Sequence, residues 1–225
     1  MKILIGVLLL CTFICCDMNG TEPMETEPLR YLALGDSYTI GESVDEELRW
    51  PVQLVAKLNE RDSNYADPQL IARTGWTTDE LQTAIGEANP EGPFDLVSLL
   101  IGVNNQFRGY DFVQYEKEFV ALLEQAIDFA GGEVDKVFVV SIPDYGLTPF
   151  GSRYNPEKVA RELDEYNAYA QAQAEARRVR FYNITPISRE AGEDPDLIAE
   201  DNLHPSGEMY RRWVEEVILP GFSED

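Results

Sequence analysis

Cysteine is absent from most of this 225-residue chain, because Cys11, Cys15 and Cys16 all lie within the first sixteen residues. A disulfide framework and a thiolate metal site are therefore excluded from the body of the protein. Histidine occurs once, at His204, which excludes a histidine-rich metal site. The spaced carboxylates of an EF-hand loop are also missing. A site for calcium or magnesium made of carboxylates alone stays open as an alternative, but we expect neither a metal nor a cofactor.

Basic residues are scarce: 18 lysines and arginines stand against 41 acidic residues, which gives a net charge of −23. We therefore expect no nucleic-acid partner, and an anionic membrane surface would repel the folded protein. The chain is 44% hydrophobic and 11% aromatic, which is ordinary globular composition, and its length fits one domain.

An apolar stretch near the N-terminus follows Met1 and Lys2 and spans residues 3–16. It is too short to cross a bilayer comfortably and is typical of a signal peptide. Residues 17–28 are polar and contain two prolines, which predicts a disordered tether before a domain at 29–225. Cysteine at the end of such a run resembles a bacterial lipoprotein signal, which implies cleavage before Cys16 and a lipid on its sulfur.

The lipoprotein hypothesis leaves alternatives open. Cys15 competes with Cys16 as the lipidated residue, and the preceding residues differ from the usual Leu-Ala-Gly type of box. Plain secretion and an uncleaved anchor are the other interpretations. We expect an extracytoplasmic protein, periplasmic or at the cell surface, that contacts a membrane through a lipid anchor only.

The domain alternates short apolar runs with segments of helical periodicity. The helical segments span about 50–58, 77–89, 112–126, 159–170 and 206–219, and the runs that predict strands are 31–34, 69–72, 95–101, 136–142 and 179–182. The runs 95–101 and 136–142 lack polar alternation, which is typical of parallel strands with both faces buried. The sequence therefore predicts an α/β fold, a three-layer α/β/α sandwich around a five-stranded parallel sheet.

A serine follows the first predicted strand directly: the apolar run ends at Gly35, and Asp36 and Ser37 come next. In open α/β sheets, ligands bind outside the carboxyl ends of the strands. A serine there can act as a nucleophile if a base reaches it, and a turn serine that caps a helix is the alternative. Position 39 is threonine, so the G-x-S-x-G motif of ordinary α/β-hydrolases is absent.

The base for such a serine would have to be His204. Pro205 disfavours helical geometry at the preceding residue, which predicts His204 in a turn. The ends of a four-residue turn approach within about 7 Å, so Asp201 can accept from Nδ1–H and leave Nε2 free. That is the role of the acid in a Ser-His-Asp triad. A surface histidine beside a helix start is the alternative.

Two further candidate positions follow predicted strands, Gly75 and Asn104. Attack on an ester creates an oxyanion, which needs preorganised hydrogen-bond donors. Glycine allows close approach of a backbone N–H, and an asparagine amide is an uncharged donor. Each residue alone is more often an ordinary turn residue.

Together these positions form four short blocks in a fixed order. The blocks are Gly35-Asp36-Ser37-Tyr38, Gly75, Gly102-Val103-Asn104-Asn105 and Asp201-x-x-His204-Pro205. Over residues 30–220 the chain resembles the SGNH, or GDSL, hydrolases, and among them most the bacterial lysophospholipase-like esterases. Asn105 stands where aspartate is commoner, at a position that is not catalytic in the family.

The resemblance implies a flavodoxin-like sandwich with Ser37 as nucleophile and His204 as base, oriented by Asp201. It also implies oxyanion donors from the backbone N–H groups of Ser37 and Gly75 and from the Asn104 side chain.

Substrate contacts are predicted at Trp76 and Phe107, which follow the oxyanion donors, and at Tyr145 in the loop 142–151. Either segment could instead pack only against its neighbours.

The predicted function is a serine esterase that hydrolyses carboxylic esters through an acyl-enzyme, with a lysophospholipid or a short acyl ester as substrate. A carbohydrate O-deacetylase or an acyltransferase of the same fold is the alternative. A non-catalytic glycan-binding surface lipoprotein is the alternative from another class. The expected partner is a small-molecule, lipid or glycan ester.

Overall fold

The computed structural model describes residues 27–222 of the chain. The predicted signal segment 1–16 with Cys16, and all but the last two residues of the predicted tether 17–28, lie outside the described residues. Lipidation and export therefore stay predictions. Within residues 27–222, no helix combines the length and the apolar character that are needed to cross a membrane.

A five-stranded sheet forms the centre of the fold, with strand order β2-β1-β3-β4-β5. All its strand pairs are parallel. The strands are β1 (Tyr31–Gly35), β2 (Gln69–Ala72), β3 (Leu96–Leu100), β4 (Val137–Val140) and β5 (Arg180–Tyr182). This is the flavodoxin-like order, in which the chain reverses its direction of progress between β1 and β3. The predicted sheet is confirmed, and the strand reversal marks where a ligand is expected.

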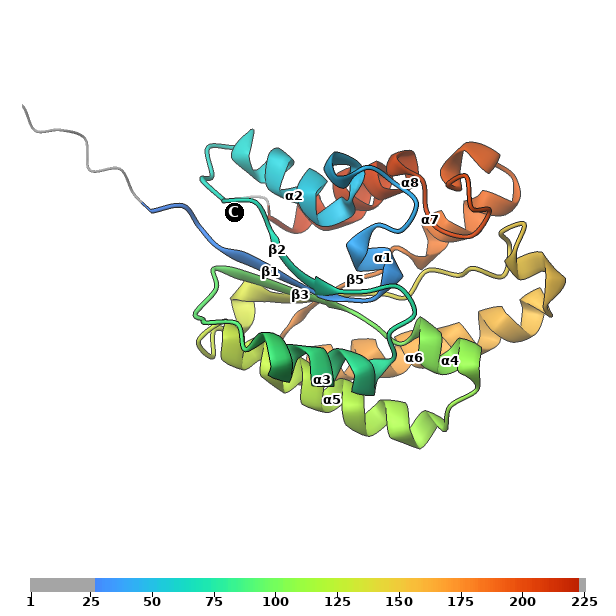
Figure 1. Ribbon diagram of the computed structural model, residues 1–225, viewed down its shortest axis with the longest axis horizontal. Coiled ribbons are helices and arrows are strands. Elements are labelled where there is room, and N and C mark those ends of the chain that lie inside the picture. The colour runs from blue at the N-terminus through green and yellow to red at the C-terminus, as the bar shows by residue number, and fades with distance from the viewer. Residues whose placement is uncertain (1–26, 223–225) are drawn as a thin grey trace, which may run out of the picture.

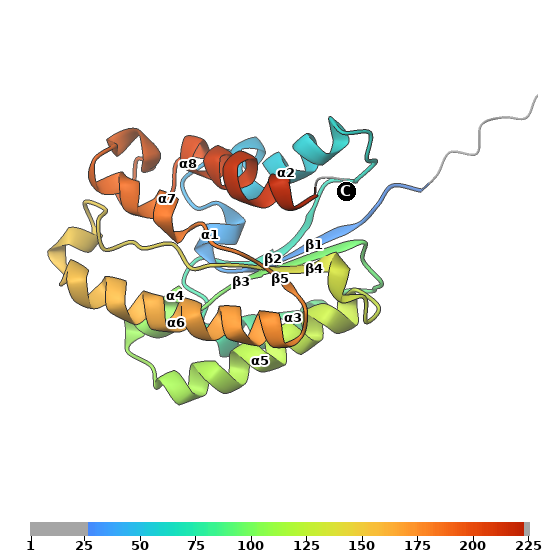
Figure 2. The same ribbon diagram turned by 180° about the vertical axis from the view of Figure 1, so that it is seen from behind.

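Helices cover both faces of the sheet, as Figures 1 and 2 show from opposite sides. One layer contains α1 (Ser37–Ile40), α2 (Trp50–Asn59), α7 (Thr185–Arg189) and α8 (Gly207–Arg212). The other contains α3 (Thr78–Ala88), α4 (Val103–Arg108), α5 (Phe112–Phe129) and α6 (Pro156–Ala176). The predicted α/β/α sandwich is therefore confirmed.

The strand sequences explain this burial. Every residue of β1, β3 and β4 is buried, because these strands lie inside the sheet and helices cover both of their faces. The polar side chain in β3, Ser98, is hydrogen-bonded to the Tyr31 hydroxyl at 2.7 Å. Trp50 of α2 and Trp213, which follows α8, are both fully buried in the layer that contains α1.

The helix starts follow the capping chemistry of the sequence. Thr77 and Glu80 form a capping box at the start of α3. Asp111 and Asn155 cap α5 and α6 by accepting from backbone N–H groups.

The last predicted helix, about 206–219, differs from the expectation. Regular α-helix ends at Arg212, and the chain continues as a π-helix over Trp213–Ile218 and a 3₁₀ turn over Leu219–Phe222. Trp213, Val214 and Ile218 are buried there, so the wider turns place these large side chains in the core.

Candidate active site

Ser37 lies at the carboxyl end of β1, as the first residue of α1. Asp36 caps this short helix, since its Oδ1 accepts from the Tyr38 N–H at 3.0 Å. Only glycine fits at the end of the strand, because a Cβ on Gly35 would lie 2.1 Å from Thr39 Oγ1 and 2.6 Å from the Leu100 carbonyl oxygen. The end of β1 therefore packs closely against Thr39 of α1 and against Leu100 at the end of β3.

His204 lies in a turn before α8, as the proline predicted. Asp201 Oδ1 accepts from the backbone N–H groups of Leu203 and His204, at 2.9 Å each. Asp201 Oδ2 is 2.5 Å from His204 Nδ1. A carboxylate can only accept, so Nδ1 carries the proton and Nε2 keeps a lone pair. The turn thus prepares His204 to receive a proton at Nε2.

The Asp201 carboxylate stays ionised over the whole working pH range. Partial burial acts to raise its pKa, but hydrogen bonds from the His204 ring, from the Leu203 and His204 backbone and from Ser43 outweigh burial. The pKa of Asp201 is thereby held at about 2. The imidazole therefore faces a full negative charge on its Nδ1 side.

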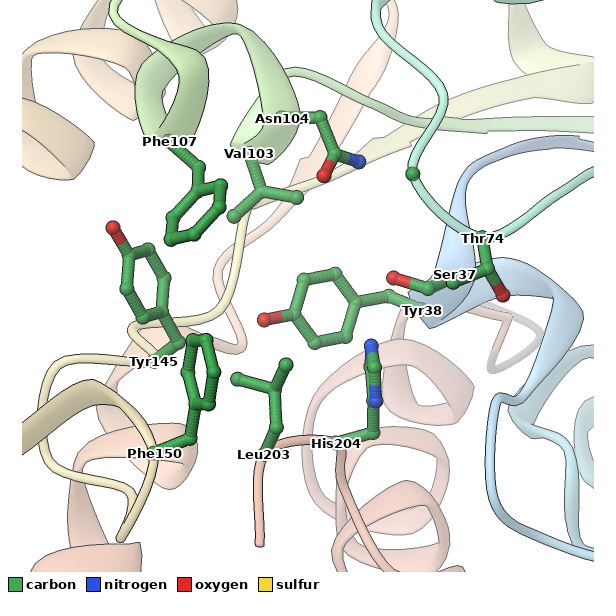
Figure 3. A pocket seen from close by; sticks show the side chains of 11 residues that line it. Ser37, Tyr38, Thr74, Val103, Asn104, Phe107, Tyr145, Phe150, Leu203 and His204 are labelled. Atoms are coloured by element: carbon green, nitrogen blue, oxygen red, sulfur yellow. The ribbon is translucent and has the colours of Figure 1, made fainter. Parts of the chain in front are cut away.

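Ser37 and His204 meet at one cavity, which Figure 3 shows from close by. The His204 ring nitrogen that is farther from the main chain is directed toward Ser37. The Tyr38 ring packs edge-on against the imidazole, with ring centroids 5.6 Å apart. Ser37 and His204 are both buried, with 4% and 7% of their surfaces exposed. The arrangement places a proton acceptor beside the hydroxyl of a serine.

Gly75 and Asn104 lie on the wall of the same cavity. Gly75 has a φ of +88°, a left-handed conformation that a side chain would strain. Asn104 follows β3, as predicted, and lies in the first turn of the short helix α4, which the sequence analysis did not predict. Its Nδ2 donates to the Trp76 carbonyl oxygen at 2.9 Å, which fixes the amide. An amide nitrogen carries two hydrogens, so a second N–H remains for a ligand in the cavity.

Asn105, where aspartate is commoner in the resembled family, has a structural position. It is fully buried, accepts from the Thr78 N–H at 3.1 Å and donates to Thr78 Oγ1 at 2.7 Å. Arg108 holds the same region from outside, since its Nη2 donates to the Gly75 carbonyl oxygen at 2.5 Å. Asn105 therefore joins α4 to the first residue of α3, and Arg108 joins α4 to Gly75.

The cavity itself is small, about 130 Å³, and mainly apolar side chains form its walls. The predicted contacts Phe107 and Tyr145 lie on its wall. Trp76 does not line the cavity; its side chain packs against the hydrophobic core. The sequence analysis did not single out Tyr38, Val103 and Leu203, which also line the cavity. All three lie within the four sequence blocks, each directly beside Ser37, Asn104 or His204, and that adjacency is the signal that could have found them.

The described residues contain no group of three or more His, Cys, Asp or Glu side chains that could hold a metal ion.

The profile of the GDSL-like lipase/acylhydrolase family matches residues 33–212 of the sequence. The chain belongs to this family. Family membership makes the protein a GDSL-type hydrolase that acts on ester bonds. The matched stretch includes all four sequence blocks, and these blocks converge on one cavity of this GDSL-type hydrolase.

Solved structures of other proteins share the fold of the hydrolase. The crystal structure of TesA matches with a TM-score of 0.67 at 18% identity, over 86% of this chain and 98% of that chain. The psychrotrophic esterase EstA from Pseudoalteromonas sp. matches with a TM-score of 0.57 at 19% identity, over 85% of this chain and 97% of that chain. Axe2, an acetylxylan esterase from Geobacillus stearothermophilus, matches with a TM-score of 0.64 at 18% identity, over 88% and 95%. A comparison with curated proteins gives no match.

Asp36 makes the stability of the hydrolase depend on pH. Burial raises the pKa of this carboxyl from 3.8 to about 7, and the hydrogen bond from Tyr38 opposes that rise only in part. Its Oδ2 has no hydrogen-bond partner within the described residues. Between about pH 4 and pH 7 the folded state therefore keeps a proton that the unfolded chain has lost, so stability falls as pH rises through this window.

Asp36→Asn is expected to remove this decline, because the amide cannot ionise. At about 1.4 kcal/mol per pH unit, the free energy of unfolding of wild type should fall by up to about 3 kcal/mol more than that of the variant between pH 5 and pH 8. Urea unfolding of both proteins at the two pH values measures the difference. Two curves that change in parallel with pH would show that Asp36 ionises normally in the folded state.

Proposed function

We propose that the protein is a serine esterase that cleaves esters of short acyl groups through an acyl-enzyme. In this proposal Ser37 is the nucleophile, His204 the general base and Asp201 the residue that orients it. The observation that carries the proposal is the convergence of Ser37 and the Asp201-bound His204 on one apolar cavity, with Gly75 and Asn104 on its wall.

In the acylation step, His204 Nε2 takes the proton of Ser37 Oγ while Oγ forms a bond to the ester carbonyl carbon. The carbonyl oxygen becomes an oxyanion, which the backbone N–H groups of Ser37 and Gly75 and the free N–H of Asn104 stabilise. The carbonyl then re-forms, the bond to the alcohol oxygen breaks, and the imidazolium gives its proton to the departing alkoxide. An acyl-Ser37 ester and a free alcohol result.

In the deacylation step, water replaces the alcohol. His204 Nε2 takes one proton from the water as its oxygen attacks the acyl carbon. The same donors hold the second oxyanion, the bond to Ser37 Oγ breaks, and the proton returns to Oγ. The acid leaves, and no oxidant, metal or cofactor is needed to balance either step.

The size of the cavity supports a short acyl group over a lysophospholipid chain. An apolar cavity of about 150 Å³ holds benzene, a six-carbon ligand. The cavity beside Ser37 has about 130 Å³, so an acyl group of about two to six carbons fits. Phe107, Tyr145 and Phe150 close its far side.

A second hollow favours a polar alcohol and so the carbohydrate O-deacetylase alternative. It has about 440 Å³ and shares Phe107 and Tyr145 with the cavity. Its polar lining includes Gln106, which accepts from the Tyr145 hydroxyl at 2.9 Å and donates to Glu162 at 2.8 Å. Amide and carboxylate groups can bind hydroxyls of an alcohol group. Axe2, which shares the fold, is an acetylxylan esterase.

Acyl chain length tests the proposal. We expect kcat/KM for p-nitrophenyl acetate and butyrate to exceed that for the palmitate ester by about 100-fold, since surplus methylenes do not fit the cavity. Phe150→Ala removes a wall and should move the preference toward longer chains. A palmitate ester or lysophosphatidylcholine hydrolysed as fast as the acetate would contradict the short-acyl assignment.

Other measurements in the same series separate the alternatives. Acetylated xylan identifies a deacetylase, and product analysis with added alcohol identifies an acyltransferase. EstA is inhibited by monoethylphosphonate, and a fluorophosphonate probe should likewise label Ser37 here. A wild-type protein that the probe does not label would favour the non-catalytic glycan-binding alternative.

A further inference from the structure

Glu42 and Ser43 follow the helix that begins with Ser37, and we call this pair the clasp. The Ser37 carbonyl oxygen accepts from the N–H groups of Gly41 and Glu42, at 3.0 Å each, which attaches the clasp to the backbone of the proposed nucleophile. Ser43 has a φ of +66°, which is uncommon for a residue with a side chain. Neither clasp residue lines the cavity beside Ser37.

The Ser43 side chain reaches the Asp201 turn. Its Oγ donates to Asp201 Oδ2 at 2.8 Å, and this is the oxygen that the His204 Nδ1–H also approaches. With both donors in place, the rotation of the carboxylate is fixed relative to the imidazole. The hydrogen bond from Ser43 also contributes to the low pKa of Asp201.

The Glu42 side chain reaches the Gly75 loop. Its Oε2 accepts from the hydroxyl of Thr74, the residue directly before Gly75. Glu42 is partly buried, and the charge of its carboxylate acts on the buried Tyr210. The bond therefore restrains the residue directly before Gly75, whose N–H is a donor in the proposed function.

We propose that the clasp positions the two catalytic loops relative to the nucleophile, Ser43 through Asp201 and Glu42 through Thr74. This inference rests on the proposed function, since it assigns Asp201 and Gly75 the roles given there. Both side chains are positioning residues, and each acts on a different half of the site. Ser43 orients the Asp201–His204 pair, and Glu42 restrains the loop that carries the oxyanion donor Gly75.

The two halves predict different kinetic signatures. Ser43→Ala should lower kcat/KM about tenfold, since it removes a hydrogen bond to a charged group. At acidic pH, activity should fall as the imidazole of the base becomes protonated. In Ser43→Ala this acidic limb of the pH–activity profile should lie about half a pH unit higher, because Asp201 without Ser43 stabilises the imidazolium more strongly. Glu42→Ala should lower kcat about tenfold and leave the acidic limb of the pH–activity profile unchanged. Glu42→Gln keeps an acceptor for Thr74, so its kcat should stay near that of wild type.

Other titratable groups around the Asp201 turn need a control. Tyr38 contacts His204, and burial raises the pKa values of Tyr38 and Tyr210 well above their usual range, so both stay neutral. Asp36, with its pKa raised to about 7, and Asp144 also act on Tyr38, and Glu42 acts on Tyr210. The pH profiles of wild type and Ser43→Ala are therefore repeated with Asp36→Asn in both. The shift should persist.

Matched variants separate positioning from stability. Ser43→Gly also lacks the hydroxyl but relaxes the left-handed backbone, so equal activity in Ser43→Gly and Ser43→Ala assigns the effect to the hydroxyl. For the other half, Thr74→Val deletes the same bond from its partner, and the double variant with Glu42→Ala should lose no more than the worse single variant.

The outcomes decide between the two levels of the proposal. A wild-type protein that a fluorophosphonate probe does not label overturns the function and the clasp together. Labelled wild type with Ser43→Ala and Glu42→Ala at full kcat/KM overturns the clasp alone. Lower melting temperatures with unchanged kinetics and an unchanged pH limb would also overturn it, since they assign the two bonds to folding.

Discussion

Replacement of His204 by alanine is expected to lower kcat/KM for a short-chain ester by about 10⁴- to 10⁶-fold, the scale seen when a triad base is removed. His204 is the only histidine of the chain, so no second imidazole can take over its role. Without a base, Ser37 Oγ keeps its proton and attacks the ester only weakly. Residual activity would come from binding and the oxyanion donors.

The matched variants are Ser37→Ala and the double variant. Because nucleophile and base act as one unit, the three proteins should lose activity to nearly the same extent. The fold should persist, since alanine keeps the backbone hydrogen bonds of His204 and removes the side-chain bond to Asp201 and the ring contact with Tyr38. Circular dichroism checks this. A folded His204→Ala protein with near wild-type turnover would contradict the proposed role of the base.

The layers of the fold could be predicted because its central strands are unusually uniform. The runs that became β3 and β4 show no polar alternation, which is possible only where helices cover both faces. The strand order depends on contacts between segments far apart in sequence, such as Tyr31 with Leu96, and periodicity does not encode it. Resemblance to a known family supplied it instead.

Short elements escaped the sequence analysis for a physical reason. The helix α4 has six residues, fewer than two turns, so no apolar period can develop over it. The sequence analysis therefore placed Asn104 after a strand but predicted no helix there. The π-helix after Arg212 was missed because its larger turns serve the packing of Trp213 and its neighbours, which is a tertiary effect.

The residues that meet at the cavity could be proposed from four short blocks, whereas those that hold the blocks together could not. Ser43 and Asp201 are 158 positions apart, and an exposed serine after a helix looks like any turn residue. Glu42 is one of 41 acidic residues and carries no local pattern. Their partners become visible only when the loops are folded against each other.

Replacement of Asn104 by alanine is expected to lower kcat by about 10²- to 10³-fold with little change in KM. The ester carbonyl needs a weak hydrogen bond in the ground state and a strong one when it becomes an oxyanion, so the loss falls on the transition state. The bond from Asn104 Nδ2 to the Trp76 carbonyl oxygen keeps the amide ready before substrate arrives, which limits reorganisation during the reaction. Steady-state kinetics on a short-chain ester measures the changes in kcat and KM separately.

Asn105 provides the matched control, because it is the adjacent residue with the same side chain in a different environment. Asn105→Ala leaves the buried Thr78 N–H without its acceptor, which costs about 1–3 kcal/mol of stability for an unsatisfied buried group. The Thr78 hydroxyl loses the hydrogen bond from Asn105 but keeps its own bond to Glu118. We therefore expect Asn105→Ala to lower the melting temperature more than kcat, and Asn104→Ala to do the reverse. Full kcat in Asn104→Ala would refute its role as an oxyanion donor, and a collapsed melting temperature there would assign it to the fold instead.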